Sequence, residues 1–235
     1  MSSTARRPSA RPWRSASSIR NWLPRTAPFA AFIALLAASP LLEGLVDERW
    51  LTVGRGVIVA AILAAFWHRY EELRSPARIP LAQAAAALGA GVLLAVAWIA
   101  LDARWMVIGE APRGFVPLRA DGTLDPLLVA LRLFGFVLVV PVMEELFWRS
   151  FLMRWIDRRD FLTLDPRAAS AMALFLSSFA FALEHREWLA GFIAGVAFGM
   201  IYRRTGNLRA CIVSHATTNL TIAGWILGTH QWRLW

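Results

Sequence analysis

Long apolar blocks, separated by short stretches rich in Arg, Pro and Gly, dominate the pattern of hydrophobic and polar positions along this chain of 235 residues. A helix needs about 20 mostly apolar residues to cross the hydrocarbon core of a bilayer. The candidate blocks are 28–46, 51–67, 80–101, 127–157, 168–185, 188–202 and 208–228. The pattern therefore predicts an all-α fold, a polytopic membrane helix bundle of about seven transmembrane helices.

The blocks follow one another too closely to leave room for a separate soluble domain. We expect 28–235 to form a single transmembrane domain and 1–27 to be a basic, disordered cytoplasmic tail. The tail is rich in Arg and Ser and lacks acidic residues, so anionic lipid would attract it. A signal peptide is disfavoured because the basic stretch is long and Ser39-Pro40 is not a small-x-small cleavage pattern. A transit peptide fits the composition but not a bacterial source.

Composition supports the membrane assignment. Hydrophobic residues make up 57% of the chain, above the roughly 45–50% of a soluble domain, and the mean hydropathy is +0.49. The net charge is +9, and every basic residue is Arg. These Arg residues lie between apolar blocks rather than on one module, which argues against nucleic acid as a partner. Abundant Ala and Arg without Lys indicate a GC-rich bacterial genome, and hence the bacterial inner (plasma) membrane.

The distribution of Arg predicts the orientation. Most of the 25 basic residues lie in 1–27, 68–79, 149–167 and 203–209, which share one side of the membrane if the spans alternate. Because cytoplasmic loops are enriched in Arg and Lys, we expect a cytoplasmic N-terminus.

Charged side chains within a span are costly and usually have a function. The first such group is Glu144-Glu145-Leu-Phe-Trp-Arg149, directly after Pro141. Glu145 and Arg149 are four residues apart and can pair on one helix face. Glu144 points about 100° away from Glu145 and would face a cavity that the Pro141 kink helps to open. A buried structural ion pair explains this group equally well.

Two further groups lie on later spans. His185 follows Glu184 and closes the fifth block, while His215 and Asn219 share a face four residues apart inside the seventh. Taken singly, each is more typical of an interfacial residue or of polar contacts between helices. Cys211 lies alone in an apolar block, so no disulfide can form within the chain.

Together these residues form a set that could hydrolyse a peptide bond. Glu144 would take a proton from water with the help of His185, and His215 and Asn219 would hold the developing oxyanion. Alternatively, Glu144, His185 and His215 match a zinc site with an open position. The His-Glu-x-x-His motif is absent, so we assign no cofactor and keep a divalent metal such as zinc as the alternative.

A depth comparison leaves the geometry open. Measured along straight helices, Glu144 lies about 20 Å from the turn after Asp157, and His185 lies about 25 Å from it. His215 lies only about 10 Å from the next turn on the same side of the membrane, so its expected depth differs from the depths of Glu144 and His185.

The order Glu-Glu-x-x-x-Arg, Phe-x-x-x-His and His-x-x-x-Asn resembles the CPBP family, the CAAX-protease and bacteriocin-processing intramembrane proteases. The resemblance covers roughly 127–225, the expected protease-like core. It implies that Glu144 and His185 activate water, that His215 and Asn219 bind the oxyanion, and that Glu145 and Arg149 support them. The layout also resembles a bacterial subgroup associated with exosortase sorting systems. A CAAX substrate does not follow from the motifs.

The sequence thus predicts a CAAX-protease-like (CPBP) intramembrane endopeptidase that cuts a membrane-associated or lipid-anchored protein. The alternative is a non-catalytic membrane scaffold or an immunity-type binding protein, in which the same side chains only hold helices together. A proton-coupled transporter is a weaker alternative because the chain shows no inverted repeat.

Overall fold

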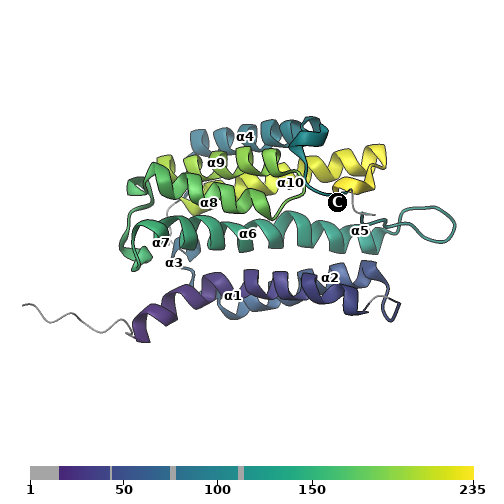
Figure 1. The fold of residues 1–235 in the computed structure, drawn as a ribbon, viewed down its shortest axis with the longest axis horizontal. Helices are drawn as coiled ribbons and strands as arrows, with labels where there is room; N and C mark the ends of the chain where they lie inside the picture. Colours follow the sequence, from purple (N-terminus) through teal and green to yellow (C-terminus); the bar gives the residue numbers. More distant parts are fainter. Residues whose placement is uncertain (1–15, 43, 75–77, 111–113) are drawn as a thin grey trace, which may run out of the picture.

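A computed structural model describes residues 16–42, 44–74, 78–110 and 114–235 (Figure 1). The helices are α1 (Ala16–Ala38), α2 (Glu48–Ala65), α3 (Glu71–Arg74), α4 (Leu81–Ala100), α5 (Pro126–Leu133), α6 (Val140–Glu144), α7 (Arg154–Asp157), α8 (Ala171–Leu183), α9 (Trp188–Thr205) and α10 (Leu208–Thr229). Within these ranges the only β pairing is an isolated bridge between Leu118 and Leu124. The predicted all-α fold is confirmed.

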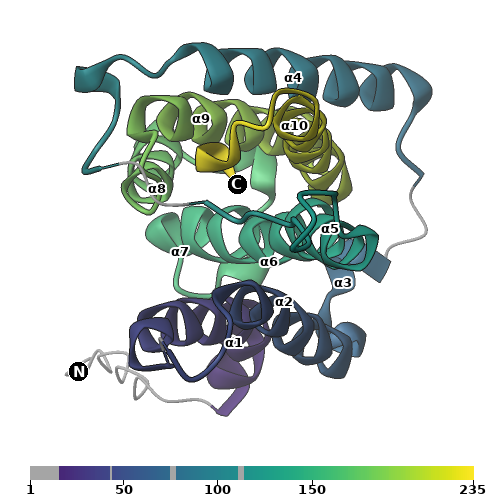
Figure 2. The same ribbon diagram turned by 90° about the vertical axis from the view of Figure 1, so that its right-hand side faces the viewer.

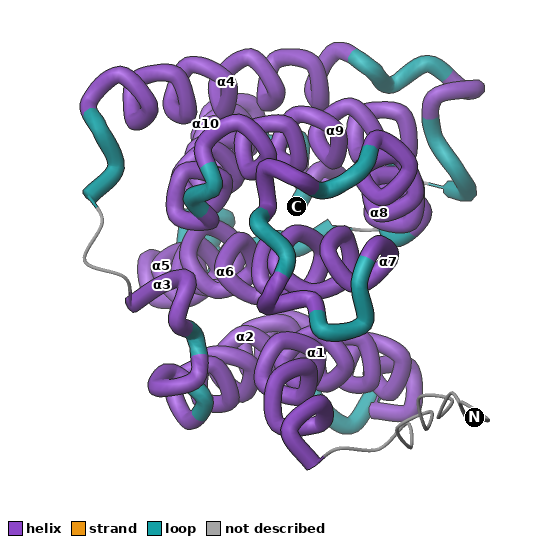
Figure 3. Tube along the Cα trace, turned by 90° about the vertical axis from the view of Figure 1, so that its left-hand side faces the viewer, coloured by secondary structure: helices purple, strands orange, loops and turns teal. Residues whose placement is uncertain are grey.

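The helices form layers around one long central helix, to which α5, α6 and α7 all belong (Figure 2). On one side of this central helix lie α1 and α2, and on the other lie α8, α9 and α10. The outermost layer is α4, which packs on α9 and α10. Figure 3 shows the same layers from the opposite end of the bundle. The central helix therefore has protein on both sides, which suits a helix that carries polar side chains.

The central helix, Pro126–Asp157, is not a regular α-helix. Its first turn is capped by Asp125, whose side chain accepts hydrogen bonds from the Leu127 and Leu128 amides. Two segments, Phe134–Val139 and Glu145–Met153, are π-helical. A π-helical turn joins residue i to residue i+5, and such turns are frequent at functional sites. The wider turns change which side chains share a face of this helix.

Four helices among the described residues are long and apolar enough to cross a membrane, where the sequence suggested about seven spans. They are Asn21–Leu42, Leu81–Ala100, Pro126–Asp157 and Leu208–Thr229. The other three predicted blocks are also helical, but α8 has only 13 residues, α9 ends in Arg203 and Arg204, and α2 begins with Glu48 and Arg49. The chain is a polytopic helix bundle whose helices differ in length and polarity.

Small residues bring α8 and α9 close together. A Cβ atom on Gly195 would lie only 3.0 Å from the Ser178 Cα atom, and one on Gly191 would lie 3.3 Å from the Ala182 Cα atom. Such close backbone approach is typical of helix pairs in membranes. This packing fixes the end of α8, where Glu184 and His185 lie.

The N-terminal boundary differs from the predicted one at residue 27. Helix α1 begins at Ala16, so the second half of the expected disordered tail is helical, while residues 1–15 lie outside the described residues. Within this part of α1, Arg25 is 1% exposed. Its Nε and NH2 atoms lie 2.8 and 2.5 Å from the two carboxylate oxygens of Glu72. This bidentate pair joins the middle of α1 to α3.

Candidate active site

Glu145, Arg149 and His215 form a buried charged cluster between the central helix and α10. The Glu145 side chain is fully buried, and its Oε1 atom lies 3.2 Å from Arg149 NH1. The same oxygen accepts a hydrogen bond of 2.9 Å from His215 Nδ1. The predicted Glu145–Arg149 pair is present, and it also holds the imidazole of a distant helix.

Aromatic rings enclose this cluster. The Phe198 ring stacks on the His215 ring with centroids 4.7 Å apart. The Arg149 guanidinium lies over Phe181 and Phe198, 4.5 and 5.3 Å from the ring centroids, and donates to the Gly195 carbonyl at 3.2 Å. The packing leaves His215 one ring orientation, in which Nδ1 faces Glu145 and Nε2 faces the other way.

Glu144 lies on the opposite side of His215. Its Oε2 atom is 3.8 Å from His215 Nε2. That oxygen is buried and has no hydrogen-bond partner, although a buried carboxylate oxygen normally has one. The neighbouring carboxylates therefore differ in environment: Glu145 Oε1 contacts both Arg149 and His215, whereas Glu144 Oε2 lies near His215 without a hydrogen bond.

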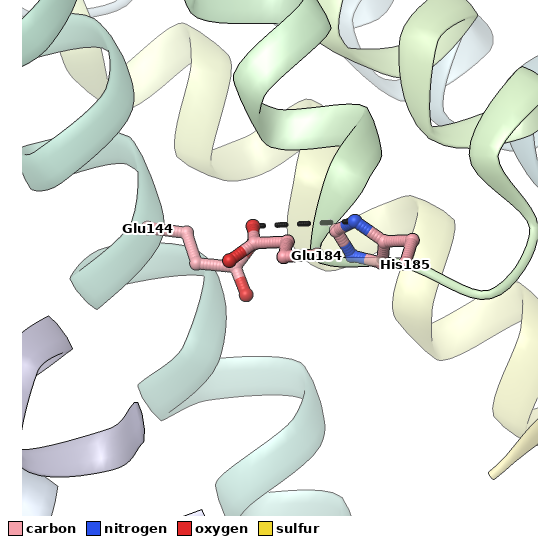
Figure 4. Close-up of side chains that lie close together, drawn as sticks. All are labelled: Glu144, Glu184 and His185. Carbon is pink, nitrogen blue, oxygen red and sulfur yellow. Dashed lines mark ion pairs between the residues drawn. The ribbon is translucent and has the colours of Figure 1, made fainter. Parts of the chain in front are cut away.

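The end of α8 brings a third carboxylate, that of Glu184, close to Glu144. Figure 4 shows Glu184 from α8 beside Glu144 from α6, with His185 on the far side of Glu184. Potential ligand atoms of these three residues all lie within 4.8 Å of one another. Glu184 Oε1 accepts a hydrogen bond of 2.9 Å from Trp148 Nε1, and it lies 4.0 Å from His185 Nδ1. Glu184 is therefore part of the site.

The hydrogen bonds of His185 define its free ring atom. Its Nδ1 lies 2.8 Å from the Phe181 carbonyl oxygen. Because a carbonyl oxygen can only accept, Nδ1 carries a hydrogen, and Nε2 of the neutral ring offers a lone pair. His215 is held in the same way by the Glu145 carboxylate. Both imidazoles are thus oriented through Nδ1 and present Nε2 to their surroundings.

Asn219 lies one turn beyond His215 on α10 and is held differently. Its Nδ2 atom donates to the Phe136 carbonyl oxygen at 2.7 Å, and the residue is 6% exposed. Phe136 lies in the first π-helical segment of the central helix. An amide nitrogen has two hydrogens, so this bond leaves Asn219 a second donor.

A cavity of about 270 Å³ connects these side chains. All four predicted catalytic residues line it: Glu144, His185, His215 and Asn219. Apolar side chains from α1, the central helix and α10 complete the walls, among them Phe32, Ile33, Leu36, Phe136 and Ile222. Glu145 and Arg149 do not line the cavity and lie behind its wall.

A divalent metal would fit a different set from the zinc site considered in the sequence. Among the described residues, the group close enough to share an ion is Glu144, Glu184 and His185, rather than Glu144, His185 and His215. Glu184 takes the place of His215 in this group because Glu145 pairs with His215 and holds the His215 ring on the other side of Glu144. Two carboxylates and one imidazole are suitable zinc ligands, and the unpaired Glu144 Oε2 is consistent with such a ligand.

Comparison with known families identifies the part of the chain that carries the site. Residues 126–221 match the family model described as Rce1-like, Type II CAAX prenyl endopeptidase Rce1-like. This segment is therefore similar to the Rce1-like family. It begins with the central helix and ends in α10, so the Rce1-like segment contains every candidate site residue named above. No curated protein matches the chain, and no solved structure matches it.

Sequence reasoning missed two members of the candidate site. Glu184 was noted only as the neighbour of His185, and Trp148 only as a residue between Glu145 and Arg149. An acidic residue at the apolar end of a helix was a signal for Glu184, because an isolated carboxylate there is costly. Trp148 gave no signal, since an apolar ring in an apolar helix is expected to pack.

Proposed function

We propose that the protein is an intramembrane endopeptidase of the CAAX-protease (CPBP) type, which hydrolyses a peptide bond of a membrane-associated or lipid-anchored protein. The Rce1-like segment and the buried polar cavity support this proposal. The observation that carries it is the buried Oε2 atom of Glu144, which has no hydrogen-bond partner. An unpaired carboxylate oxygen beside two oriented imidazoles is suited to take a proton from water.

In the proposed mechanism, Glu144 and His185 share the attacking water. The water donates one hydrogen bond to His185 Nε2 and gives its other proton to Glu144. Since the Phe181 carbonyl fixes the His185 ring through Nδ1, the lone pair on Nε2 is available to orient the water. The protonated Glu144 then delivers its proton to the leaving amine.

His215 and Asn219 stabilise the oxyanion in this proposal. His215 Nε2 can donate only when the ring is an imidazolium, because Nδ1 already donates to Glu145. The Glu145 carboxylate stabilises that positive charge, and Arg149 keeps Glu145 in place. The second amide hydrogen of Asn219 supplies another donor. Removing a single oxyanion donor typically costs about 10²–10³ in kcat.

If the protein binds a divalent metal such as zinc, we propose Glu144, Glu184 and His185 as its ligands. The metal would polarise water and lower the pKa of that water toward neutrality. Glu184 would then act through the ion, whereas without a metal it positions Trp148 and the end of α8.

The surroundings support a substrate that approaches from the membrane. Apolar side chains such as Phe32, Ile33 and Leu36 line part of the cavity, and the outer faces of the helices expose side chains such as Leu93 and Val96, which are 71% and 56% exposed. We propose that the protein is a multi-pass protein of the bacterial inner membrane with a cytoplasmic N-terminus, as the distribution of Arg predicts.

Comparative membrane proteomics tests the function. Cells would carry wild type, Glu144→Gln, or the control Glu71→Gln, which alters an exposed carboxylate on α3, at matched protein levels. We expect at least one membrane protein to be shortened with wild type and the control but not with Glu144→Gln. Identical terminal peptides in all three strains would contradict the proposal.

A measurement of stability distinguishes the competing scaffold hypothesis from the endopeptidase. A scaffold needs its polar residues for packing, so Glu144→Gln should lower stability. An enzyme should tolerate this change, because Glu144 Oε2 makes no hydrogen bond that the variant would lose. Reaction of Cys211, the single and fully buried cysteine, with a thiol dye during heating reports unfolding. A marked fall in melting temperature for Glu144→Gln would favour the scaffold.

A further inference from the structure

A second cavity, of about 320 Å³, lies where α4 and α10 begin. Three arginines from distant parts of the sequence line it: Arg78, which precedes α4, Arg167, which precedes α8, and Arg209, in the first turn of α10. Among the described residues, it shares no lining side chain with the cavity that contains Glu144. Three cations around one space repel one another, and an anion between them would offset that repulsion.

The acidic side chains near this cavity leave its wall positively charged. Glu72 lines the cavity, but its two carboxylate oxygens accept hydrogen bonds of 2.8 and 2.5 Å from Arg25, which neutralises its charge. Asp165 lies 3.6 Å from Arg167, but the two side chains are 56% and 59% exposed. An ion pair so exposed to solvent contributes little, so Arg167 remains available to another anion.

The turn between α9 and α10 is shaped to hold the Arg167 guanidinium. Gly206 ends α9 with a φ of 66°, in the left-handed region that glycine adopts without strain. A Cβ atom on Gly206 would lie only 2.5 Å from Arg167 NH1 and 2.6 Å from its Cζ atom, so the guanidinium packs directly on the glycine backbone. Arg167 NH2 also donates to the Thr205 carbonyl at 2.6 Å. This cation is therefore fixed at the cavity wall.

The other two arginines differ in how they are held. Arg209 Nε and NH2 donate to the Leu73 carbonyl at 3.1 and 2.6 Å, which fixes its guanidinium. Arg78 is exposed and forms no hydrogen bond or ion pair with any residue that the structure describes. Helix α4 begins beside Arg78 without a side-chain cap, so its first amide groups add positive potential to the same space. The cavity thus joins two fixed cations to a third whose donors are free.

The position of the cavity matches the depth of lipid headgroups. Helices α4 and α10 are both long and apolar enough to cross a membrane, so their first residues lie near the headgroup region. Leu81 directly follows the lining residue Pro80 and is 86% exposed. Leu88 and Val92 are 48% and 44% exposed on the same face of α4. A phospholipid can therefore place its phosphate between the arginines and its acyl chains along α4.

We propose that Arg78, Arg167 and Arg209 bind the phosphate group of an anionic phospholipid. Guanidinium groups match phosphate oxygens in a planar, bidentate arrangement. In the proposed orientation all three arginines lie on the cytoplasmic side, and basic pockets between membrane helices on that side are typical sites for acidic lipids. Inorganic phosphate offers the same oxygens, but the exposed apolar face of α4 beside the cavity favours a lipid.

Native mass spectrometry of the purified full-length protein in a neutral detergent tests this site. The probes are phosphatidylglycerol and phosphatidylcholine with identical acyl chains, and inorganic phosphate as a competitor. The variants are Arg78→Gln, the double variant Arg78→Gln/Arg167→Gln and its lysine counterpart Arg78→Lys/Arg167→Lys. A matched control, Arg158→Gln/Arg204→Gln, removes two exposed arginines that do not line the cavity. Reaction of Cys211 with a thiol dye during heating confirms that each variant is folded.

An arginine near anionic lipid strengthens binding about five-fold. We expect phosphatidylglycerol to bind wild type and the control at least about 25-fold more tightly than phosphatidylcholine. Arg78→Gln should lower this ratio about five-fold and the glutamine double variant about 25-fold, whereas the lysine double variant should keep most of it because a lysine also binds phosphate. Arg78 forms no hydrogen bond in the described structure, so Arg78→Gln tests the site even if the double variant unfolds.

Three results would overturn the inference. The first is equal affinity of wild type for the two lipids. The second is a ratio that Arg78→Gln leaves unchanged, or that the control lowers as much as the glutamine double variant does. The third is displacement of phosphatidylglycerol by an equal concentration of inorganic phosphate, which would assign the cavity to a free anion instead of a lipid.

Discussion

The buried pair of Glu145 and Arg149 should be strongly coupled in stability. Its two charged atoms are 3.2 Å apart, which corresponds to about 5 kcal/mol at an effective dielectric constant of about 20. Glu145→Leu would leave Arg149 as an unpaired charge that is 2% exposed. It would also remove the 2.9 Å hydrogen bond from His215. Breaking one partner of a buried pair costs about 3–5 kcal/mol.

Removing both charges should cost less than the two single changes together. Arg149→Met leaves the Glu145 carboxylate with His215 alone, and we expect a loss of about 3–5 kcal/mol. The double variant leaves no unpaired ion, and it still loses the contacts of Arg149 with Phe181 and Phe198. We therefore expect the double variant to lose no more than about 5 kcal/mol, against about 6–10 kcal/mol for additive effects.

The assay is the reaction of buried Cys211 with a thiol dye as a function of denaturant, for wild type, both single variants and the double variant. The midpoints give the coupling energy of a double-mutant cycle. Arg158→Met serves as a control, because this exposed residue lies at the end of the same helix. Additive losses would refute the reasoning, since they would mean that the two charges do not stabilise each other.

Further predictions concern the parts that support the site. Burial of Glu72 opposes its ionisation, but hydrogen bonds from Arg25 and Ser150 lower its pKa below the ordinary 4.5. The ionised Glu72 therefore stabilises the folded protein at pH values above 4.5, and this stabilisation is lost as the pH falls through the lower pKa of the folded state. A wild-type pH titration of stability should therefore show an acid-side loss that Glu72→Gln lacks. Gly195→Leu should separate α8 from α9 and cost about 1–3 kcal/mol or more by the Cys211 assay. Trp148→Phe should cost about 1–2 kcal/mol, because the Glu184 carboxylate loses its donor.

The positions of the long helices and the order of the polar groups along the chain could be predicted from the sequence. Apolar blocks marked the long helices, and Glu145 with Arg149 could be paired because residues four apart share a helix face. The pairing of Arg25 with Glu72 could not be predicted, since Glu72 belongs to another helix. Such a long-range pair leaves no local pattern in the sequence.

The predicted depth of His215 was wrong, again because it depends on contacts between helices. Straight helices placed it about 10 Å from Glu144 in depth, but its Nε2 is 3.8 Å from the Glu144 carboxylate. The Glu145–Met153 segment is π-helical, so the straight α-helix assumed for that depth does not hold there. Neither this change nor the place of Glu184 beside Glu144 follows from spacing alone, because both depend on how helices pack.

Hydrolysis in H₂¹⁸O by the purified protein tests the central claim most directly. The substrate is the protein that the proteomic comparison identifies, reconstituted with wild type, Glu144→Gln or Glu71→Gln in nanodiscs at equal concentration. We expect wild type and Glu71→Gln to release a product whose new C-terminal carboxyl group contains one ¹⁸O atom, and Glu144→Gln to release at least about 10³-fold less, as expected for loss of a general base. A Glu144→Gln variant that releases labelled product at the wild-type rate would contradict the assignment of Glu144 as the group that activates water.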